Sequence, residues 1–404
     1  MRVFSVPVSV PLLRTVIAAL VDGRLVDGFE ARGNPERLAQ ATLYLPTRRA
    51  GRLAREIFLD VLGTDAAILP RIVALGDIDE DELAFAEEGD YGGAAPLDIP
   101  PRVGELERRL TLAHLVAAWA KTPVSAPLVV GGPASTLQLA GDLARLIDDM
   151  VTRGVDWTAL DTLVPDLLDK YWQHSLEFLQ IARKAWPAYL AEIKKIEPAA
   201  RRDRLIDAEA VRLTKHHDGP VVAAGSTGSM PSTAKFLHAV AKLPNGAVVL
   251  PGLDTDLDEE SWRSIGGEID AKGKFTTPPA SNHPQYAMHA LLSRLGIKRR
   301  DVEVLGKPAP GGREVLASEA MRPSNATSEW HDRLKRLDIA AQISAGMDKL
   351  AVVEAPNPEM EALAIAVAMR EAHHLQKSAA LVTPDRALAR RGMAAPGRVS
   401  LRFA

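Results

Sequence analysis

The amino-acid sequence predicts an α/β protein in which a parallel sheet is interrupted by a large all-helical insert. Three observations support this fold class. Strand and helix units occur twice near the amino terminus, residues 100–195 show helical periodicity only, and strand patterns return between residues 221 and 252. Because consecutive units of a strand followed by a helix are typical of parallel sheets covered by helices, we expect the sheet to resume after the insert.

Two strand and helix units open the chain. Each strand is a short apolar run, and each helix carries apolar residues three or four positions apart; these elements cover residues 2–6, 12–20, 41–46 and 48–62. Thr47 directly precedes the second helix, where a hydroxyl side chain can accept a hydrogen bond from a backbone amide, so it is predicted to be the N-cap. In that helix we expect Leu53, Ile57 and Val61 to share one face.

The insert is predicted to contain helices only. Amphipathic segments of helical length follow one another there, at residues 105–120, 137–151 and 172–193. In the middle segment Leu139, Leu143, Leu146 and Met150 recur three or four positions apart. This spacing predicts that the four side chains form one face of a helix.

Strand patterns return after the insert. Residues 221–225 and 247–252 are apolar runs that flank an amphipathic segment at 233–243, which predicts a unit of strand, helix and parallel strand. The Pro- and Gly-rich stretches at 276–284 and 306–312 predict loops or domain boundaries.

A further α/β unit is predicted near the carboxyl end. Residues 350–355 and 379–384 resemble strands, the segment between them (358–375) is an amphipathic helix, and residues 385–391 begin another helix. The residues after Arg391 depart from the helical pattern, so a following strand that would bury the apolar face is missing. We therefore expect the chain to be truncated near Arg391.

Composition narrows the class of protein. The chain has 404 residues, 47% of them hydrophobic and 25% charged, which is ordinary for a globular protein of two or three domains. With a formal net charge of -3, any nucleic-acid contact must come from a local basic patch. The absence of cysteine excludes disulfides, thiol nucleophiles and iron–sulfur clusters, and it fits a reducing compartment.

The first twenty residues do not have the pattern of a signal peptide. Pro7, Pro11 and Arg14 interrupt their apolar run, and no small residues spaced as in a cleavage site follow. No stretch reaches the roughly 20 apolar residues that a membrane-spanning helix needs. We expect a cytoplasmic protein without a membrane partner.

A nucleotide-binding phosphate loop is missing after the first predicted strand. Such a loop needs glycines, a lysine and a Ser or Thr, whereas residues 6–15 contain neither Gly nor Lys, and only Thr15 supplies the terminal hydroxyl. Two prolines also remove backbone donors. The histidines lack the spacing of four that places two imidazoles on one helix face, and we assign no metal, cofactor or catalytic site in this chain.

Two segments are candidates for binding nucleic acid. In the first, Thr47 is followed by Arg48, Arg49 and Arg52 near the start of a helix, a position that suits contacts with phosphates. The plainer interpretation is a solvated basic helix face whose arginines pair with Glu56 and nearby acids.

The second candidate is a Gly- and Ser-rich turn between a predicted strand and a helix, with Ser226, Thr227 and Ser229. Its backbone amides are suited to an anion, but no lysine stands at the position that a phosphate loop requires. We interpret this stretch first as a strand-to-helix turn in which Ser229 is a candidate helix cap and Pro231 lies near the helix start. A contact with nucleic acid or with another subunit is the alternative.

The chain resembles the AddB family, of the alphaproteobacterial type, which provides the helicase-like subunit of bacterial AddAB helicase–nucleases. The segments that carry the resemblance are long and occur in order, at residues 43–56, 68–83, 172–190, 223–254 and 283–296. The resemblance extends to about Arg391. It implies a role in double-strand break repair and DNA recombination, in which AddB and the AddA-type helicase/nuclease subunit unwind and resect DNA ends.

The resemblance also implies a domain organisation, that of two superfamily-1 helicase-like parallel-sheet lobes with helical inserts. Its divisions are a first α/β segment of lobe 1, a helical insert, the remainder of lobe 1, an irregular linker and the start of a truncated second lobe, at residues 1–95, 96–215, 216–305, 306–345 and 346–404. The family's nuclease region, which binds Mg and an iron–sulfur cluster, is absent here. No cofactor is therefore expected in this chain.

Two functions follow from these observations. The first is a non-catalytic, helicase-like portion of an AddB-type subunit that contacts DNA and scaffolds the AddA motor. The second is an independent α/β enzyme that binds a phosphorylated small molecule or nucleotide at the Gly- and Ser-rich turn. Salt-sensitive binding to forked or single-stranded DNA distinguishes the first from the second.

Overall fold

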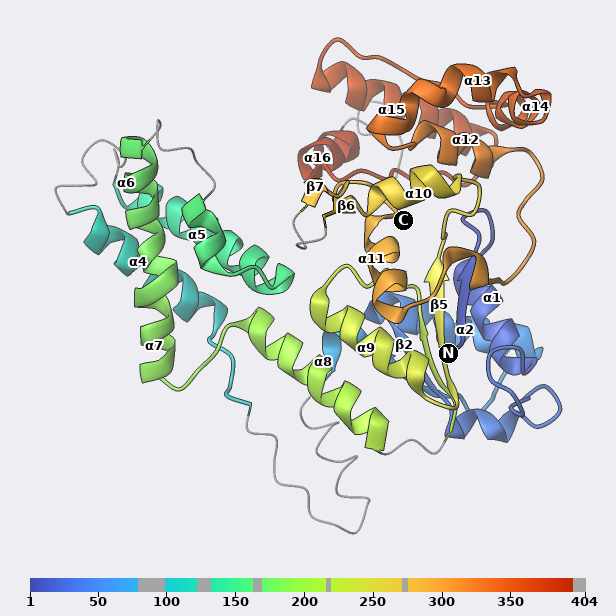
Figure 1. Ribbon diagram of the computed structural model, residues 1–404, viewed down its shortest axis with the longest axis horizontal. Coiled ribbons are helices and arrows are strands. Elements are labelled where there is room, and N and C mark those ends of the chain that lie inside the picture. Colours follow the sequence, from blue (N-terminus) through green and yellow to red (C-terminus); the bar gives the residue numbers. More distant parts are fainter. Residues whose placement is uncertain (79–98, 122–131, 163–168, 216–218, 271–274, 395–404) are drawn as a thin grey trace. The chain divides into compact units, whose positions relative to one another are not determined.

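The computed structural model describes residues 1–78, 99–121, 132–162, 169–215, 219–270 and 275–394 (Figure 1). The chain divides into two compact units, Met1–Ile343 and Ser344–Ala404. In the part of the chain so described, no helix is both long enough and apolar enough to cross a membrane. The boundary predicted between residues 95 and 96 lies outside the described residues.

The first unit is built on a parallel sheet. Over the described residues this sheet has six strands in the order β3-β2-β4-β5-β1-β8. The strands are β1 (Val3–Val6), β2 (Thr42–Leu45), β3 (Arg71–Ala74), β4 (Val221–Ala224), β5 (Gly246–Pro251) and β8 (Glu303–Val304). The predicted α/β fold with a parallel sheet is confirmed, as are β1, β2, β4 and β5, whereas β3 and β8 were not predicted.

A second, antiparallel pair of short strands lies between the large sheet's β5 and β8 in the sequence. It consists of β6 (Glu268–Ile269) and β7 (Phe275–Thr277). The loop predicted over 276–284 therefore begins as a strand, which corrects that prediction at its first two residues. The loop predicted over 306–312 is confirmed.

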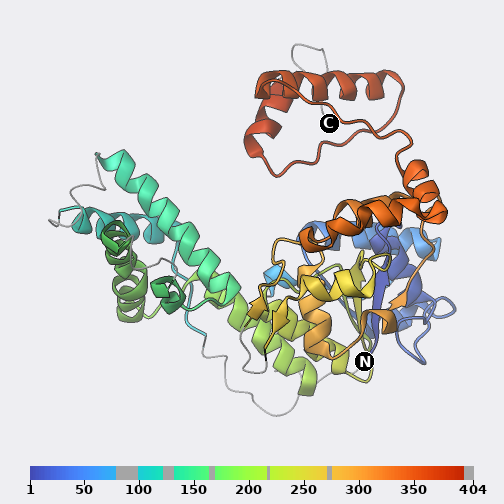
Figure 2. The ribbon, with the colours of Figure 1, turned by 45° about the horizontal axis from the view of Figure 1, so that its top comes forward.

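Helices cover both faces of the large sheet (Figures 1 and 2). One face packs against α1 (Leu12–Val21) and α2 (Arg48–Leu62), and the other against α8 (Pro198–Lys215), α9 (Pro231–Lys242) and α11 (Tyr286–Leu295). Because strand side chains alternate between faces, Leu43 and Leu45 join the core under α1 and α2, while Tyr44 meets Phe236 of α9 with ring centroids 4.8 Å apart.

The connections give the sheet a switch point between β2 and β4. The chain leaves β2 through α2 and pairs next at β3, on the outer side, whereas it leaves β4 through α9 and pairs next at β5, on the other side. In open α/β sheets, ligands bind outside the carboxyl ends of neighbouring strands whose connections diverge in this way. The loops that follow β2 and β4 carry the two candidate segments.

Helices between residues 99 and 193 form a group with its own core. They are α4 (Glu105–Trp119), α5 (Pro133–Arg153), α6 (Asp169–Gln180) and α7 (Trp186–Glu192), with a π-helical turn (Ile181–Ala185) before α7. Buried side chains of this core include Leu112, Leu143, Ile147 and Trp186. The predicted helices are thus confirmed where the chain is described.

The apolar spacing predicts the inward face of α5 and, in part, that of α2, where Ile57 and Val61 pack against the core but Leu53 does not. In α2 the buried residues are Gly51, Ala54 and Phe58, while Leu53 is 48% exposed. A methyl group at Gly51 would lie 3.4 Å from Ile72, a van der Waals contact, so α2 packs directly on β3 at this residue. In α5 the predicted face is confirmed: Leu143 and Met150 are buried, and Leu139 and Leu146 pack half-buried against the core beside Ala140 and Ile147.

Shorter helices follow β5 in the sequence. They are α10 (Glu259–Ile265), α12 (Arg313–Ala320), α13 (Trp330–Lys335) and α14 (Leu337–Gly346), and five 3-10 turns lie at Pro35–Gln40, Leu75–Asp77, Trp157–Thr162, Arg299–Asp301 and Ser324–Glu329 within the described residues.

The second unit contains helices α15 (Pro358–His374) and α16 (Arg386–Ala394), both predicted. The strands predicted at 350–355 and 379–384 are wrong, because neither segment is a strand. Val352 and Val382 are 85% and 92% exposed. Valine favours strands, but a strand forms only where a neighbour accepts its backbone hydrogen bonds, and the described residues of this unit provide none.

Candidate functional site

The first candidate segment begins at the carboxyl end of β2. The amide of Ala50 donates a hydrogen bond to Thr47 Oγ1 at 3.2 Å, which confirms Thr47 as the N-cap of α2. Arg48 and Arg49 therefore lie in the first turn of the helix, and Arg52 lies one turn later. All three arginines are exposed.

Only one of these arginines lines the groove that opens beside them. This groove, with a volume of about 660 Å³, is lined by Arg48 together with Arg102, Arg201 and Arg202. Arg49 and Arg52 are not among its lining residues. We call it the arginine groove. Its four arginines come from three separate places in the sequence: the start of α2, the segment before α4 and the first turns of α8.

Backbone and side-chain contacts hold the newly found arginines in place. Arg102 forms a parallel bridge with Ile196, and the next amide, that of Val103, donates to the carbonyl of Ile196 at 3.0 Å. The guanidinium of Arg202 pairs with Asp203 at 3.2 Å and reaches the hydroxyl of Thr152 on α5 at 3.5 Å.

The arginine groove carries a net positive charge. Among the described residues that line it, Asp148 is the one acid, and its carboxylate already binds Arg108 at 2.9 Å. Arg108 also binds Glu197 at 3.0 Å, and burial raises the pKa of that carboxyl above its ordinary value. The described residues that line the groove thus include four arginines, of which Arg202 is paired with Asp203, and one carboxylate, which is engaged with Arg108. This excess of arginine over acid among the lining residues suits phosphate groups.

The amino termini of two helices add partial positive charge at the arginine groove. Arg48 is the first residue of α2, and Pro198, Ala199, Arg201 and Arg202 belong to the first turns of α8; all five line the groove. The amino-terminal end of a helix carries a partial positive charge and unpaired amides, which favour anions.

The second candidate segment lies against the first at the switch point. Gly225 adopts a φ of +82°, and a methyl group there would lie 3.4 Å from Pro46, which precedes Thr47. The amide of Gly228 donates to Ser226 Oγ at 3.3 Å, so the hydroxyl stabilises the turn itself. Thr227 is half-buried.

The start of α9 corrects the assignment of its cap. Met230 is the N-cap residue and no side chain caps the helix, so the interpretation of Ser229 as a cap is wrong; its side chain is exposed. The position of Pro231 as the first helical residue is confirmed. Proline has no backbone N–H, so α9 has one unpaired amide fewer at its start, and the missing side-chain cap costs little free energy. The arginine groove is not lined by Ser226, Thr227 or Ser229.

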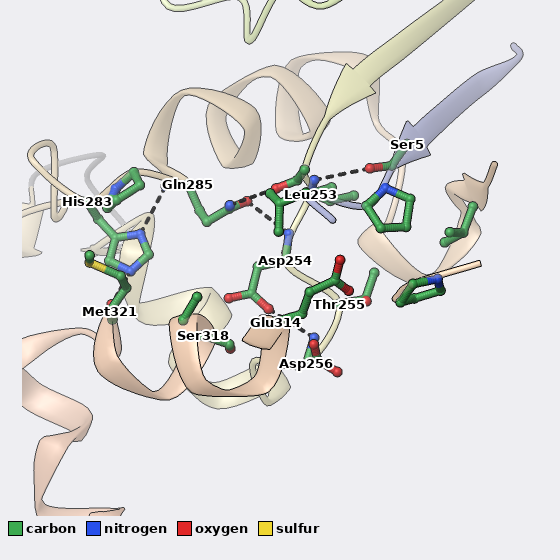
Figure 3. Close-up of a pocket in the computed structure, with 17 residues that line it drawn as sticks. Ser5, Leu253, Asp254, Thr255, Asp256, His283, Gln285, Glu314, Ser318 and Met321 are labelled. Carbon is green, nitrogen blue, oxygen red and sulfur yellow. Dashed lines mark hydrogen bonds between the residues drawn. The ribbon is translucent and has the colours of Figure 1, made fainter. Parts of the chain in front are cut away.

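The end of β1 is occupied by groups that do not suit a nucleotide. The hydroxyl of Thr15 donates to the carbonyl of Pro11 at 2.9 Å, and a neighbouring pocket is lined by Asp254, Asp256 and Glu314 (Figure 3). Neither Lys nor Arg is among the residues that line this pocket. Carboxylates at this place repel phosphates, in agreement with the missing phosphate loop.

Comparisons with known proteins identify no relative of this chain. A scan against protein-family models finds no match, and a search of curated proteins also finds none. In the part of the chain that the structure describes, no three His, Cys, Asp or Glu residues are placed to hold a metal ion.

Proposed function

We propose that this chain is the amino-terminal, non-catalytic portion of an AddB-type helicase-like subunit, and that it contacts DNA ends and scaffolds an AddA-type motor during double-strand break repair and recombination in the cytoplasm. The observation that carries the DNA contact is the arginine groove. The resemblance of the sequence to the AddB family supplies the partner and the pathway.

The groove has the chemistry that a nucleic-acid backbone requires. Half or more of the hydrogen bonds between proteins and DNA go to phosphate and sugar groups, and arginine is a frequent donor. Arg48, Arg102 and Arg202 come from different elements and line one open groove. Several arginines along an open groove suit the phosphates of a nucleic-acid backbone.

The side chains at the carboxyl end of β1 support a role without nucleotide hydrolysis. Thr15, the one hydroxyl that suits a phosphate loop, is bonded to its own helix, and Asp254 and Asp256 lie near the end of β1. The alternative, an enzyme that binds a phosphorylated small molecule at Ser226 to Ser229, has less support because the amide of Gly228 is already bonded to Ser226.

The salt dependence of DNA binding tests this proposal. The full chain, or its complex with the motor, is titrated with forked DNA at several salt concentrations, and the variant Arg102→Ala/Arg202→Ala is compared with wild type. For each phosphate that the variant no longer neutralises, the slope of log K against log salt should become shallower by about 0.7 to 0.9.

Arg24→Ala is the matched control. Arg24 is exposed and lies after the carboxyl end of α1. This position is near the amino ends of the strands, whereas the groove lies near their carboxyl ends. The proposal predicts an unchanged slope for this variant. Equally shallow slopes in both variants, or binding of a phosphorylated small molecule without DNA affinity, would contradict it.

A further inference from the structure

A second pocket lies at the carboxyl ends of β1, β5 and β8, apart from the arginine groove (Figure 3). Its volume is about 260 Å³. The loop after β5 forms one wall and is held by side chains: Ser5 Oγ accepts from the amide of Leu253 at 3.1 Å, and Gln285 accepts from the amide of Asp254 at 3.1 Å and donates to the carbonyl of Gly252 at 3.0 Å. The pocket is therefore preformed, as small-molecule sites usually are.

Three carboxylates give the pocket a negative charge. Asp254, Asp256 and Glu314 line it, and no lysine or arginine is among the lining residues. Within the described part of the chain, the carboxylate of Asp256 accepts no hydrogen bond. Partial desolvation raises the pKa of Asp256 above its ordinary value, and the negative charges of Asp254 and Glu314 raise it further. A positive charge placed here would relieve this repulsion.

A buried hydroxyl points independently to a ligand. Ser318 on α12 lines the same pocket, is 6% exposed, and its Oγ has no hydrogen-bond partner among the described residues. A buried hydroxyl without a partner is unfavourable, and native structures generally satisfy such groups. The hydroxyl can accept a hydrogen bond from a donor that enters the pocket.

The remaining walls are apolar and set the size of the ligand. Pro7, Val8, Val304, Pro308 and Met321 contribute them. The volume lies below the usual range for drug-sized ligands, so it suits a few heavy atoms. The absence of a three-ligand metal group among the described residues favours an organic cation over a metal ion.

We propose that this pocket binds a small organic cation, an ammonium or guanidinium group on a short aliphatic stem, with the head between Asp254, Asp256 and Glu314, a hydrogen bond to Ser318, and the stem against the apolar walls. Such a head is supplied by a free amine or by the basic side chain of a partner protein. The shared chemistry is a hydrogen-bond donor with a full positive charge.

Calorimetric titration of the full chain with putrescine tests the proposal. Saturable binding with a Kd of about 1 mM or below is expected, because charge-assisted hydrogen bonds are made inside a partly desolvated pocket. Butane-1,4-diol has the same length without the charge and should not bind. Absence of putrescine binding, or equal binding of the diol, would overturn the proposal.

Variants locate the site. Asp256→Asn should weaken putrescine binding about tenfold or more, and Ser318→Ala about threefold or more. Asp256 is an exposed loop residue, and Ser318→Ala removes one oxygen, so neither change endangers folding. Glu56→Gln, an exposed acid on α2, is the control and should bind as wild type does. Equal effects of all three changes would overturn the assignment to this pocket.

A peptide distinguishes the two sources of the cation. If a short blocked peptide with one central lysine binds as tightly as putrescine, and Asp256→Asn weakens it equally, the pocket accepts a basic side chain of a partner. If only putrescine binds, the ligand is a free amine. Both results support a cation site.

Discussion

The hydroxyl of Tyr44, in the middle of β2, donates a hydrogen bond to the carboxylate of Glu209 on α8. Arg212, one turn later on the same helix, binds that carboxylate at 2.7 Å. Burial alone would raise the pKa of Glu209, but the hydrogen bond and charge of Arg212, together with Tyr44, lower it below its ordinary value. This bond ties the helix that carries Arg201 and Arg202 to the strand that leads to Arg48.

Replacing Tyr44 with phenylalanine should therefore destabilise the sheet unit. The change removes one donor from a buried carboxylate, and the expected decrease in the free energy of unfolding is about 1–3 kcal/mol. Urea denaturation followed by circular dichroism measures it. Tyr286→Phe is the control, because the hydroxyl of this half-buried tyrosine makes no hydrogen bond within the described part of the chain. Equal decreases in the two variants would show that the bond between Tyr44 and Glu209 contributes nothing.

The stability of α10 should depend on pH through its N-cap. Asp258 accepts from the amide of Ser261 at 2.8 Å and from Arg322 at 2.7 Å. Partial burial would raise its pKa, but these hydrogen bonds lower it to about 2. Because the folded pKa is lower than the unfolded one, of about 3.9, the carboxylate stabilises the fold above pH 4, and this contribution is lost as the pH falls towards 2.

Hydrogen exchange of peptides that cover residues 257–266 measures this dependence. Asp258→Asn should exchange faster than wild type at pH 6, and the difference should shrink as the pH falls below 4. A difference that stays constant with pH would assign the effect of the substitution to packing and not to ionisation.

The purified chain should not hydrolyse ATP, even with single-stranded DNA present. Residues 6–15 contain neither Gly nor Lys, and the hydroxyl of Thr15 is bonded to Pro11. An ATPase assay of the chain alone, and of its complex with the motor, makes the comparison. Steady turnover by the chain alone that Thr15→Ala abolishes would refute this expectation.

The parts of the fold that the sequence predicts well are those encoded locally. The strand over 221–225 is a continuous apolar run, and the cap at Thr47 needs only a hydroxyl one position before a helix. β3 begins with the charged Arg71, and β8 consists of only two residues, the first of which is Glu303, so neither is a continuous apolar run. Both are strands because a neighbouring strand pairs with them.

The strand wrongly predicted at 350–355 has the same cause, which is that strand formation depends on a pairing partner. Val352 and Val353 have high strand propensity, yet pairing depends on a partner that propensity does not encode. The arginine groove shows the same limit for a site. Arg201 and Arg202 stand side by side near the start of a helix, as Arg48 and Arg49 do. No sequence pattern indicates that Arg48 but not Arg49 lines the same groove as Arg201 and Arg202, or that Arg102 joins them.

Adjacent arginines on α2 provide the most direct test of the proposed DNA contact. Arg48 and Arg49 are both exposed and carry the same charge, but only Arg48 lines the arginine groove. The binding of forked DNA by Arg48→Ala and Arg49→Ala is measured as a function of salt, with wild type in parallel. If the groove contacts DNA, Arg48→Ala should reduce the magnitude of the salt slope by about 0.7 to 0.9, and Arg49→Ala should leave it close to the wild-type value. Equal reductions in both variants, or no reduction in either, would contradict the assignment of DNA binding to the groove.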